Sequence, residues 1–229
     1  MKRPNFRQGG FTLVELVFVI AIIVVLASIF LPLAISKLSK ADDAVADASI
    51  QEIAAALTSF YDDLRHFPTC DHATDCNTGF DGSNNNLVFL AFGEGFGDLS
   101  ATYPSNDTAA GDWNLTVNDE TAGARNNGAN HVVTNDPEGD GTSNESTDYK
   151  TTGSKSWKGP YVARVNTDPW GKTYIAYVGA MEASGQTVSG ATAAQRGWIL
   201  SAGPNNSLDT QPESTTLQVD DRGFIFHTE

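Results

Sequence analysis

The sequence predicts an α+β fold in which one long N-terminal helix, transmembrane in its first half, packs against a C-terminal antiparallel β-sheet. Residues 16–35 form an almost unbroken apolar run, and an apolar stripe with helical spacing continues from there to Phe67. Short segments rich in aromatic and β-branched residues, separated by turn residues, follow near the C-terminus. With 229 residues, the chain is long enough for one sizeable domain and an appendage.

The composition argues against two broad classes of function. The formal net charge is −14, whereas binding to nucleic-acid phosphates needs a clustered basic surface, so we expect no nucleic-acid partner. The chain contains no G-x-S-x-G, H-E-x-x-H or P-loop motif, and its four histidines are scattered. We therefore expect no enzyme. The alternative, a membrane-anchored hydrolase, would show activity in the isolated head.

The N-terminal apolar run has the length of a membrane span. Between residues 16 and 35 only Ser28 is polar, and a bilayer requires about 20 apolar residues. A secretory signal peptide has a shorter apolar core with a small-residue cleavage site after it, but here Gly9 and Gly10 stand before the run. Because the preceding residues are basic, the positive-inside rule places the N-terminus in the cytoplasm.

Glu15 is the one charged residue at the head of this apolar run. An unpaired carboxylate inside a bilayer is costly, so intramembrane acids are usually functional. Glu15 lies close enough to the boundary that its side chain can also extend to the interface without any further role. Both interpretations remain open on the residues alone.

The stretch RQGGFTLVELVFVIAIIVVLAS resembles the class III signal of type IV prepilins and pseudopilins. The resemblance implies that a prepilin peptidase cuts after Gly10 and methylates the new N-terminal residue, Phe11. It also implies that Glu15 docks the subunit into a growing helical filament of identical subunits. The α-amine of Phe11 would lie one helical turn from this carboxylate, so the two charges can pair within one chain or between neighbours.

Helical spacing continues past the membrane run. Apolar residues recur at intervals of three and four and form one narrow stripe: Ala46, Ile50, Ile53, Leu57, Phe60, Leu64 and Phe67. We predict one helix from about Thr12 to Arg65, closed by Pro68. A parallel coiled coil is the alternative for the stripe, but its small alanine end favours packing against the chain's own head.

The middle of the chain is rich in loop residues. Residues 87–92 (LVFLAF) form an apolar run that fits either a buried helix or a strand. From residue 118 to residue 156, the large apolar residues are Val132, Val133 and Tyr149. This segment cannot build a core of its own and is expected to fold only where something pins it.

The C-terminal part has the pattern of β-strands. The segments 173–178, 197–200 and 223–227 are rich in aromatic and β-branched residues. Asp168, Pro169 and Gly171 occupy the positions they favour in a type I turn just before the first of these segments. We therefore predict an antiparallel meander laid over the long helix.

The stretches WKGPYVARVNTDPWGKTYIAYV and WILSAGPNNSLDT, together with RHFPT, are similar to blocks of the major pseudopilin of type II secretion. The resemblance implies a type IV pilin-like fold and a structural filament subunit of a periplasmic pseudopilus that drives export of folded proteins. It also implies an inner-membrane, single-pass subunit with a periplasmic head, whose partners are the inner-membrane assembly platform and minor pseudopilins.

The region between these blocks departs from that family, because residues 70–156 are much longer than the corresponding region of a typical major pseudopilin. Large surface insertions are a feature of type IV pilins, so a surface fibre for adhesion, motility or DNA uptake is the alternative. The expected organisation is a cleaved leader (1–10), a transmembrane and filament-core helix (11–35), its amphipathic continuation (36–68), a loop-rich insertion (69–156) and a C-terminal β-sheet region (157–229).

Cys70 and Cys76 are the two cysteines of the chain. In an exported head they would normally form a small disulfide loop. A zinc site completed by His66 and His72 is a second interpretation, and free thiols are a third. The spacing does not match a familiar zinc-finger pattern.

A calcium site is expected in the loop before the last strand. Calcium takes six to eight oxygen ligands from carboxylates, amides and carbonyls. In major pseudopilins a calcium ion pins the matching loop, and the resemblance points to Asn206, Asp220 and Asp221, and less firmly to Asn205, Ser201 and Asp209. A weaker second candidate is the stretch with Asp136, Glu138 and Asp140, which starts like an EF-hand loop but lacks a glutamate at its twelfth position.

Overall fold

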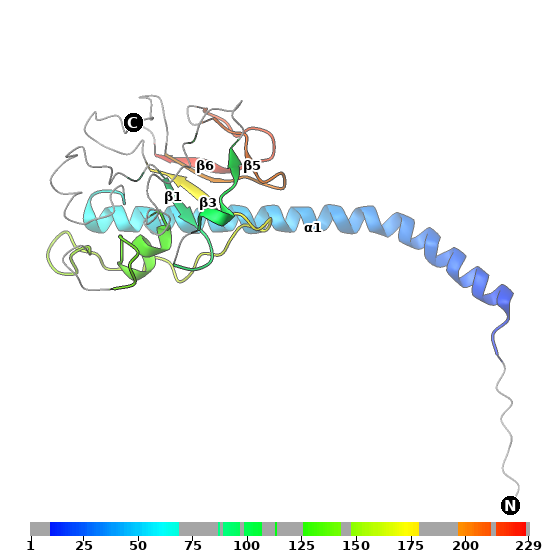
Figure 1. Cartoon of the computed structure of the whole chain (residues 1–229). Helices are drawn as coiled ribbons and strands as arrows, with labels where there is room; N and C mark the ends of the chain where they lie inside the picture. Colours follow the sequence, from blue (N-terminus) through cyan, green and yellow to red (C-terminus); the bar gives the residue numbers. More distant parts are fainter. Residues whose placement is uncertain are drawn as a thin grey trace, which may run out of the picture. The chain divides into compact units, whose positions relative to one another are not determined.

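The computed structural model describes residues 10–68, 87, 89–96, 99–106, 113, 126–142, 148–178, 197–211 and 214–227. It contains two compact units, Met1–Asp42 and Asp43–Glu229, which we describe separately. The helix α1 (Leu13–Leu64) contributes to both units. The other elements belong to the second unit, the head (Figure 1): β1 (Phe89–Phe92), η2 (Ser100–Thr102), β2 (Ser105–Asn106), η3 (Asn130–Thr134), β3 (Tyr174–Tyr177), β4 (Gly197–Ser201), β5 (Ser207–Leu208) and β6 (Arg222–His227).

In the head, the C-terminal part of α1 buries the apolar stripe expected from the sequence. Ala46, Ile50, Ile53, Leu57, Phe60 and Leu64 are buried, with Ala56 beside them, and Phe67 is partly buried against the same cluster. The partners of the stripe are residues of the sheet, so packing against the chain's own head is confirmed over the coiled-coil alternative. The helix ends where predicted: Arg65 is left-handed (φ 67°), and its amide donates to Tyr61 O at 2.7 Å.

The sheet has four antiparallel strands in the order β1-β3-β4-β6. The predicted meander is β3-β4-β6, and β1 adds a strand beside β3, with Phe89 opposite Tyr177 and Phe92 opposite Tyr174. The apolar run at residues 87–92 therefore contains a strand and not a helix. The turn predicted before β3 is present, because Gly171 N donates to Asp168 O at 3.0 Å.

Both faces of the sheet are buried along β1, β3 and β4. Alternate residues of each strand point to opposite faces, so Leu90, Phe92 and Ile199 pack with the stripe of α1, whereas Phe89, Trp198 and Leu200 pack in a second cluster. The second cluster also contains Leu99, Trp113 and Leu208. Leu99 and Trp113 of the insertion and Leu208 of β5 thus cover the face of the sheet that α1 does not.

The polar segment around residue 130 is anchored in the first cluster. Val132 is fully buried there and Tyr149 nearly so. Beside them His131 is fully buried, with its Nδ1 2.8 Å from the Tyr149 hydroxyl, and Trp157 Nε1 donates to His131 O at 2.8 Å. Tertiary contacts therefore hold this polar segment in place, as its composition predicted. They do so through η3, a helical turn that the hydropathy pattern did not indicate.

Candidate functional site

The residues expected to direct processing and assembly lie at the start of α1 and just before it. Gly10 and Phe11 are exposed and precede the helix, with Phe11 91% exposed. Glu15 lies in the first helical turn. Its Oε2 accepts the backbone N–H of Thr12 at 2.8 Å and the Thr12 hydroxyl at 2.9 Å, while Glu15 N donates to Thr12 Oγ1 at 3.2 Å.

This reciprocal arrangement is a capping box. The Thr12 hydroxyl oxygen satisfies an amide of the first turn, and the Glu15 carboxylate reaches back to the amide of the capping residue. The pattern T-x-x-E before an apolar run could have revealed it in the sequence. Glu15 therefore has a local partner in the full-length chain, where Phe11 N belongs to a peptide bond with Gly10.

The N-terminal half of α1 exposes apolar side chains all around its circumference. Among the described residues, α1 is the one helix long and apolar enough to cross a membrane, and none of its most apolar window is buried. Phe18, Ile22 and Phe30, for example, are all more than half exposed. A helix that is apolar all round requires an apolar environment, which a bilayer or a bundle of like helices supplies.

In the C-terminal loop, which we define as residues 203–221 between β4 and β6, the best-defined carboxylate is Asp221. Its side chain is 4% exposed, and Oδ2 accepts the N–H groups of Asp209 at 2.9 Å and Thr210 at 2.6 Å. Burial outweighs these hydrogen bonds and raises the pKa of Asp221 to about 6. Within the described residues, Asp221 Oδ1 is buried without a hydrogen-bond partner.

Two further side-chain oxygens of the loop are also buried without a hydrogen-bond partner among the described residues. Asp220 Oδ2 accepts Asn205 N at 3.0 Å, whereas Asp220 Oδ1 and Asn206 Oδ1 are buried and have no hydrogen-bond partner in the described part of the chain. Gly203 makes the close packing possible, because a Cβ on it would lie 2.3 Å from Asp220 O. The three residues expected most firmly as calcium ligands therefore each carry one buried acceptor oxygen that lacks a donor.

The less firmly expected ligands are arranged differently. Asn205 Oδ1 accepts Ser207 N at 2.7 Å, and Asn205 Nδ2 donates to Asp209 Oδ2 at 2.7 Å. Ser201 is fully buried, and its hydroxyl donates to Asp168 Oδ2 at 2.6 Å. The Ser201 hydroxyl therefore binds Asp168, in the turn before β3. Burial raises the pKa of the Asp168 carboxyl group.

Comparison with known proteins identifies the N-terminal segment. Residues 5–31 match the model of the prokaryotic N-terminal methylation motif. The match places the chain in the type IV pilin-like class. No curated protein and no solved structure matches the chain.

An N-terminal segment of the type IV pilin-like class fits the geometry at the start of α1. The motif implies processing by a prepilin peptidase and assembly into a filament, and it suggests a structural subunit and not an enzyme. A single apolar N-terminal helix is compatible with a single-pass membrane anchor, as in other proteins of the class. The long helix and the antiparallel sheet also agree with a type IV pilin-like α+β fold.

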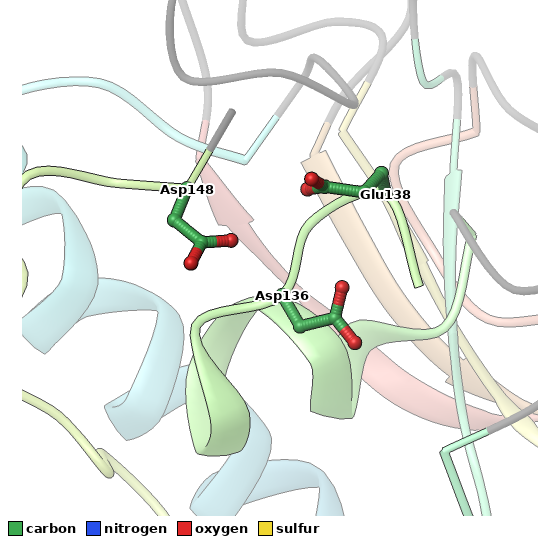
Figure 2. Close-up of side chains that lie close together, drawn as sticks. All are labelled: Asp136, Glu138 and Asp148. Carbon is green, nitrogen blue, oxygen red and sulfur yellow. The ribbon is translucent and has the colours of Figure 1, made fainter. Parts of the chain in front are cut away.

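A second group of carboxylates forms beside η3, where the sequence had suggested the weaker calcium candidate. Ligand atoms of Asp136, Glu138 and Asp148 lie within 4.8 Å of one another, and Figure 2 shows the Glu138 side chain extending toward Asp148. Asp140, which the EF-hand pattern includes, is not part of this group. Asp136 accepts the N–H groups of Gly139, Asp140 and Gly141 at 2.9–3.2 Å, and burial raises the pKa of its carboxyl group.

Cys70, Cys76 and His72 lie outside the described residues, so the disulfide and zinc hypotheses stay predictions. His66 is described, and its ring lies edge-on to Phe60 with centroids 5.9 Å apart. Its Nδ1 is 2.9 Å from Phe67 O. Burial lowers the pKa of His66, which favours its neutral form.

Proposed function

We propose that this chain is the major pseudopilin of a type II secretion system, a structural subunit of a periplasmic pseudopilus that drives export of folded proteins. The N-terminal methylation motif supports the coarser part of the proposal, a prepilin-type filament subunit. The observation that carries the finer part is the hydrogen bond between Ser201 and Asp168, at 2.6 Å. It joins the D-P-W-G turn to the S-x-G block, two of the blocks in which the sequence is similar to major pseudopilins.

The mechanical role follows from the chemistry of the N-terminus. Cleavage after Gly10 would turn Phe11 N into a positively charged amine beside the Glu15 carboxylate. Inside a bundle of apolar helices such a charge pair is stable only when both partners are in place, so it can set the register of one subunit against the next. The exposed apolar surface of the N-terminal half of α1 would then pass from lipid into the filament core.

A type IV pilin of a surface fibre is the second candidate. The feature that favours it is the length of the region between the blocks that are similar to major pseudopilins, residues 70–156, which adds Trp113 and η3 to the head. Surface insertions of this kind suit a fibre that presents its heads to the environment.

A deletion strain separates the two functions when culture supernatant and cell surface are examined together. We expect loss of exported proteins from the supernatant, restored by the wild-type gene but not by Glu15→Leu. Glu52→Leu, the same change at an exposed position of α1 in the head, serves as the matched control and should restore export. Normal export together with lost surface fibres would overturn the pseudopilin assignment in favour of the type IV pilin.

We also propose that the C-terminal loop holds a structural calcium ion. The residues fit such an ion, because Asn206, Asp220 and Asp221 each offer a buried oxygen without a donor and the loop adds its own carbonyls. Asp221 is buried although its carboxyl is acidic, and a cation would stabilise the ionised form that burial disfavours. When bound, calcium would supply a fixed positive charge that ties the two ends of the loop together.

Thermal unfolding of the full-length chain in detergent tests this site. A ligand that binds the folded state raises the melting temperature by an amount that grows with its concentration. We expect such a shift with calcium and none with a chelator, and loss of the shift in Asp220→Ala with Asp221→Ala. Asp140→Ala, at an exposed aspartate outside the loop, is the control and should keep the shift. Identical melting of the wild type in calcium and chelator would remove the site.

A further inference from the structure

We propose that calcium in the C-terminal loop fastens the insertion onto the head, so that the covering of the second face of the sheet by Trp113 and the attachment of Ser105 to the loop depend on the ion. This inference rests on the calcium site proposed above. It goes beyond that site because it assigns the ion a role in placing a segment that lies about a hundred residues earlier in the sequence.

The first attachment runs through Asn206. Ser105 N and Ser105 Oγ both donate to Asn206 O at 2.9 Å, and β2 pairs with β5 in parallel directly beside this contact. Asn206 is left-handed (φ 61°), and its side-chain Oδ1 is one of the buried oxygens that lack a donor. One residue therefore holds the insertion with its carbonyl and offers its amide oxygen to the ion.

The second attachment runs through Thr210. Trp113 is fully buried in the second cluster, and its Nε1 donates to Thr210 O at 2.7 Å. The N–H of the same Thr210 donates to Asp221 Oδ2 at 2.6 Å. The position of Asp221 thus sets the position of the carbonyl that receives the indole of Trp113.

These two chains of contacts couple ion binding to docking. A ligand shifts a conformational equilibrium only by its difference in affinity for the two states. The oxygens of Asn206 and Asp221 are held in place in the state in which Asn206 O and Thr210 O bind the insertion. Calcium should therefore favour the docked insertion, and a docked insertion should raise calcium affinity by the same factor.

The chain contains an internal reference for this coupling. Just before β2, Thr102 O accepts the N–H of Thr173 at 3.1 Å. Thr173 directly precedes β3, so this contact joins the insertion to the sheet and not to the C-terminal loop. In the same way, the indole of Trp157 donates to His131 O at 2.8 Å, in the first cluster. Neither contact involves the C-terminal loop, so neither should respond to calcium.

Hydrogen exchange of tryptophan indole groups in the full-length chain, labelled with ¹⁵N and held in detergent micelles, tests the proposal. The Trp113 resonance is assigned by its loss in Trp113→Phe. We expect calcium to slow exchange at the Trp113 indole by about tenfold or more relative to chelator, an effect within the usual range of coupling between sites. Exchange at the Trp157 indole should stay unchanged. The same comparison in Asp221→Asn should show no calcium effect at Trp113.

Calorimetric titration of calcium supplies the reciprocal measurement. Trp113→Phe keeps a six-membered aromatic ring but removes the indole donor together with part of a buried ring system, so we expect calcium affinity to fall by about fivefold or more, the effect of at least one net hydrogen bond. Trp157→Phe is the matched control and should leave the affinity unchanged. Calcium binding with unaltered exchange at Trp113 and unaltered affinity in Trp113→Phe would overturn the coupling while the site stands. Absence of any binding heat, with no shift in melting, would overturn both.

Discussion

The carboxylate of Glu15 accepts hydrogen bonds from the amide and the hydroxyl of Thr12, at 2.8 and 2.9 Å. The uncleaved chain thus gives the one acid at the head of its apolar N-terminal run a partner before any filament exists, which lowers the cost of keeping a charge at the head of an apolar helix. Cleavage after Gly10 would create a second and stronger partner, the amine of Phe11. The same carboxylate would then serve first in capping and later in assembly.

Two substitutions at Glu15 separate these uses. Glu15→Gln keeps an oxygen that can complete the capping box and removes the charge, whereas Glu15→Leu removes both. We expect both variants to be inserted and cleaved, and both to fail in filament assembly, because only a carboxylate pairs with the Phe11 amine. Thr12→Ala is the complement: it loses the cap, at a cost of about 1 kcal/mol, and should still assemble. Electron microscopy of overexpressed filaments reads the result, and normal fibres from Glu15→Gln would show that the charge is dispensable.

We expect processing to depend on the residue before the proposed cut. Gly10 is exposed and a Cβ built on it meets nothing within 4 Å, so Gly10→Val should not disturb the fold. A branched side chain should nevertheless obstruct the extended backbone in a protease cleft, and we expect an uncut precursor. Mass spectrometry distinguishes the precursor from a mature chain that begins at a methylated Phe11. A mature chain with any other first residue would contradict the assigned cleavage point.

Ser201 was expected as a calcium ligand, but its hydroxyl binds Asp168. Ser201→Ala leaves the buried Asp168 Oδ2 without this donor, which should lower the free energy of unfolding by about 1–3 kcal/mol. The loss should be the same in calcium and in chelator. A double-mutant cycle with Asp168→Asn measures the coupling of the pair. A loss of stability that appears only in calcium would indicate that Ser201 is a calcium ligand.

The parts of the fold that the sequence predicted are those with a periodic signal. The stripe from Ala46 to Leu64 was readable because one face of a helix meets a sheet. The run at residues 87–92 was not, since β1 is buried on both faces and its residues do not alternate in polarity.

The candidate sites show the same division between local and distant contacts. The capping box of Thr12 and Glu15 is local and could have been read from its spacing. The hydrogen bond of Trp113 to Thr210 joins positions far apart in the chain, and the carboxylate of Asp148 lies near that of Glu138, ten residues earlier. The local sequence pattern does not predict these pairs, because tertiary packing alone brings the groups together.

The pH dependence of stability should include a contribution from His66. Burial lowers the pKa of His66 below its ordinary 6.5, so the unfolded chain binds the proton more readily. The stabilisation from neutral His66 is therefore present above about pH 6.5 and is lost as the pH falls through the folded-state pKa. Asp221, whose pKa is raised to about 6, and Asp168 and Asp136, whose pKa values are also raised, act in the opposite direction. The wild type must therefore be compared with His66→Phe, which keeps an aromatic ring without a titratable nitrogen. Between pH 7 and 5 the wild type should lose stability relative to this variant, by at most about 1.4 kcal/mol per pH unit. If denaturant titrations give the same pH dependence of the unfolding free energy for the wild type and His66→Phe, the prediction is contradicted.

Gly203 and Gly171 provide a matched pair for testing the packing of the C-terminal loop. Both are left-handed, with φ of 64° and 86°, but a Cβ at Gly171 meets nothing within 4 Å, whereas one at Gly203 would lie 2.3 Å from Asp220 O. Gly171→Ala should therefore show only the backbone cost of about 1–2 kcal/mol. Gly203→Ala should cost more, because Asp220 must move, and it alone should weaken calcium binding, since that movement displaces Asp220 Oδ1. Denaturant unfolding and calorimetric titration measure the two effects. Equal losses of stability, with equal calcium affinities, would show that the approach of Gly203 to Asp220 does not shape the site.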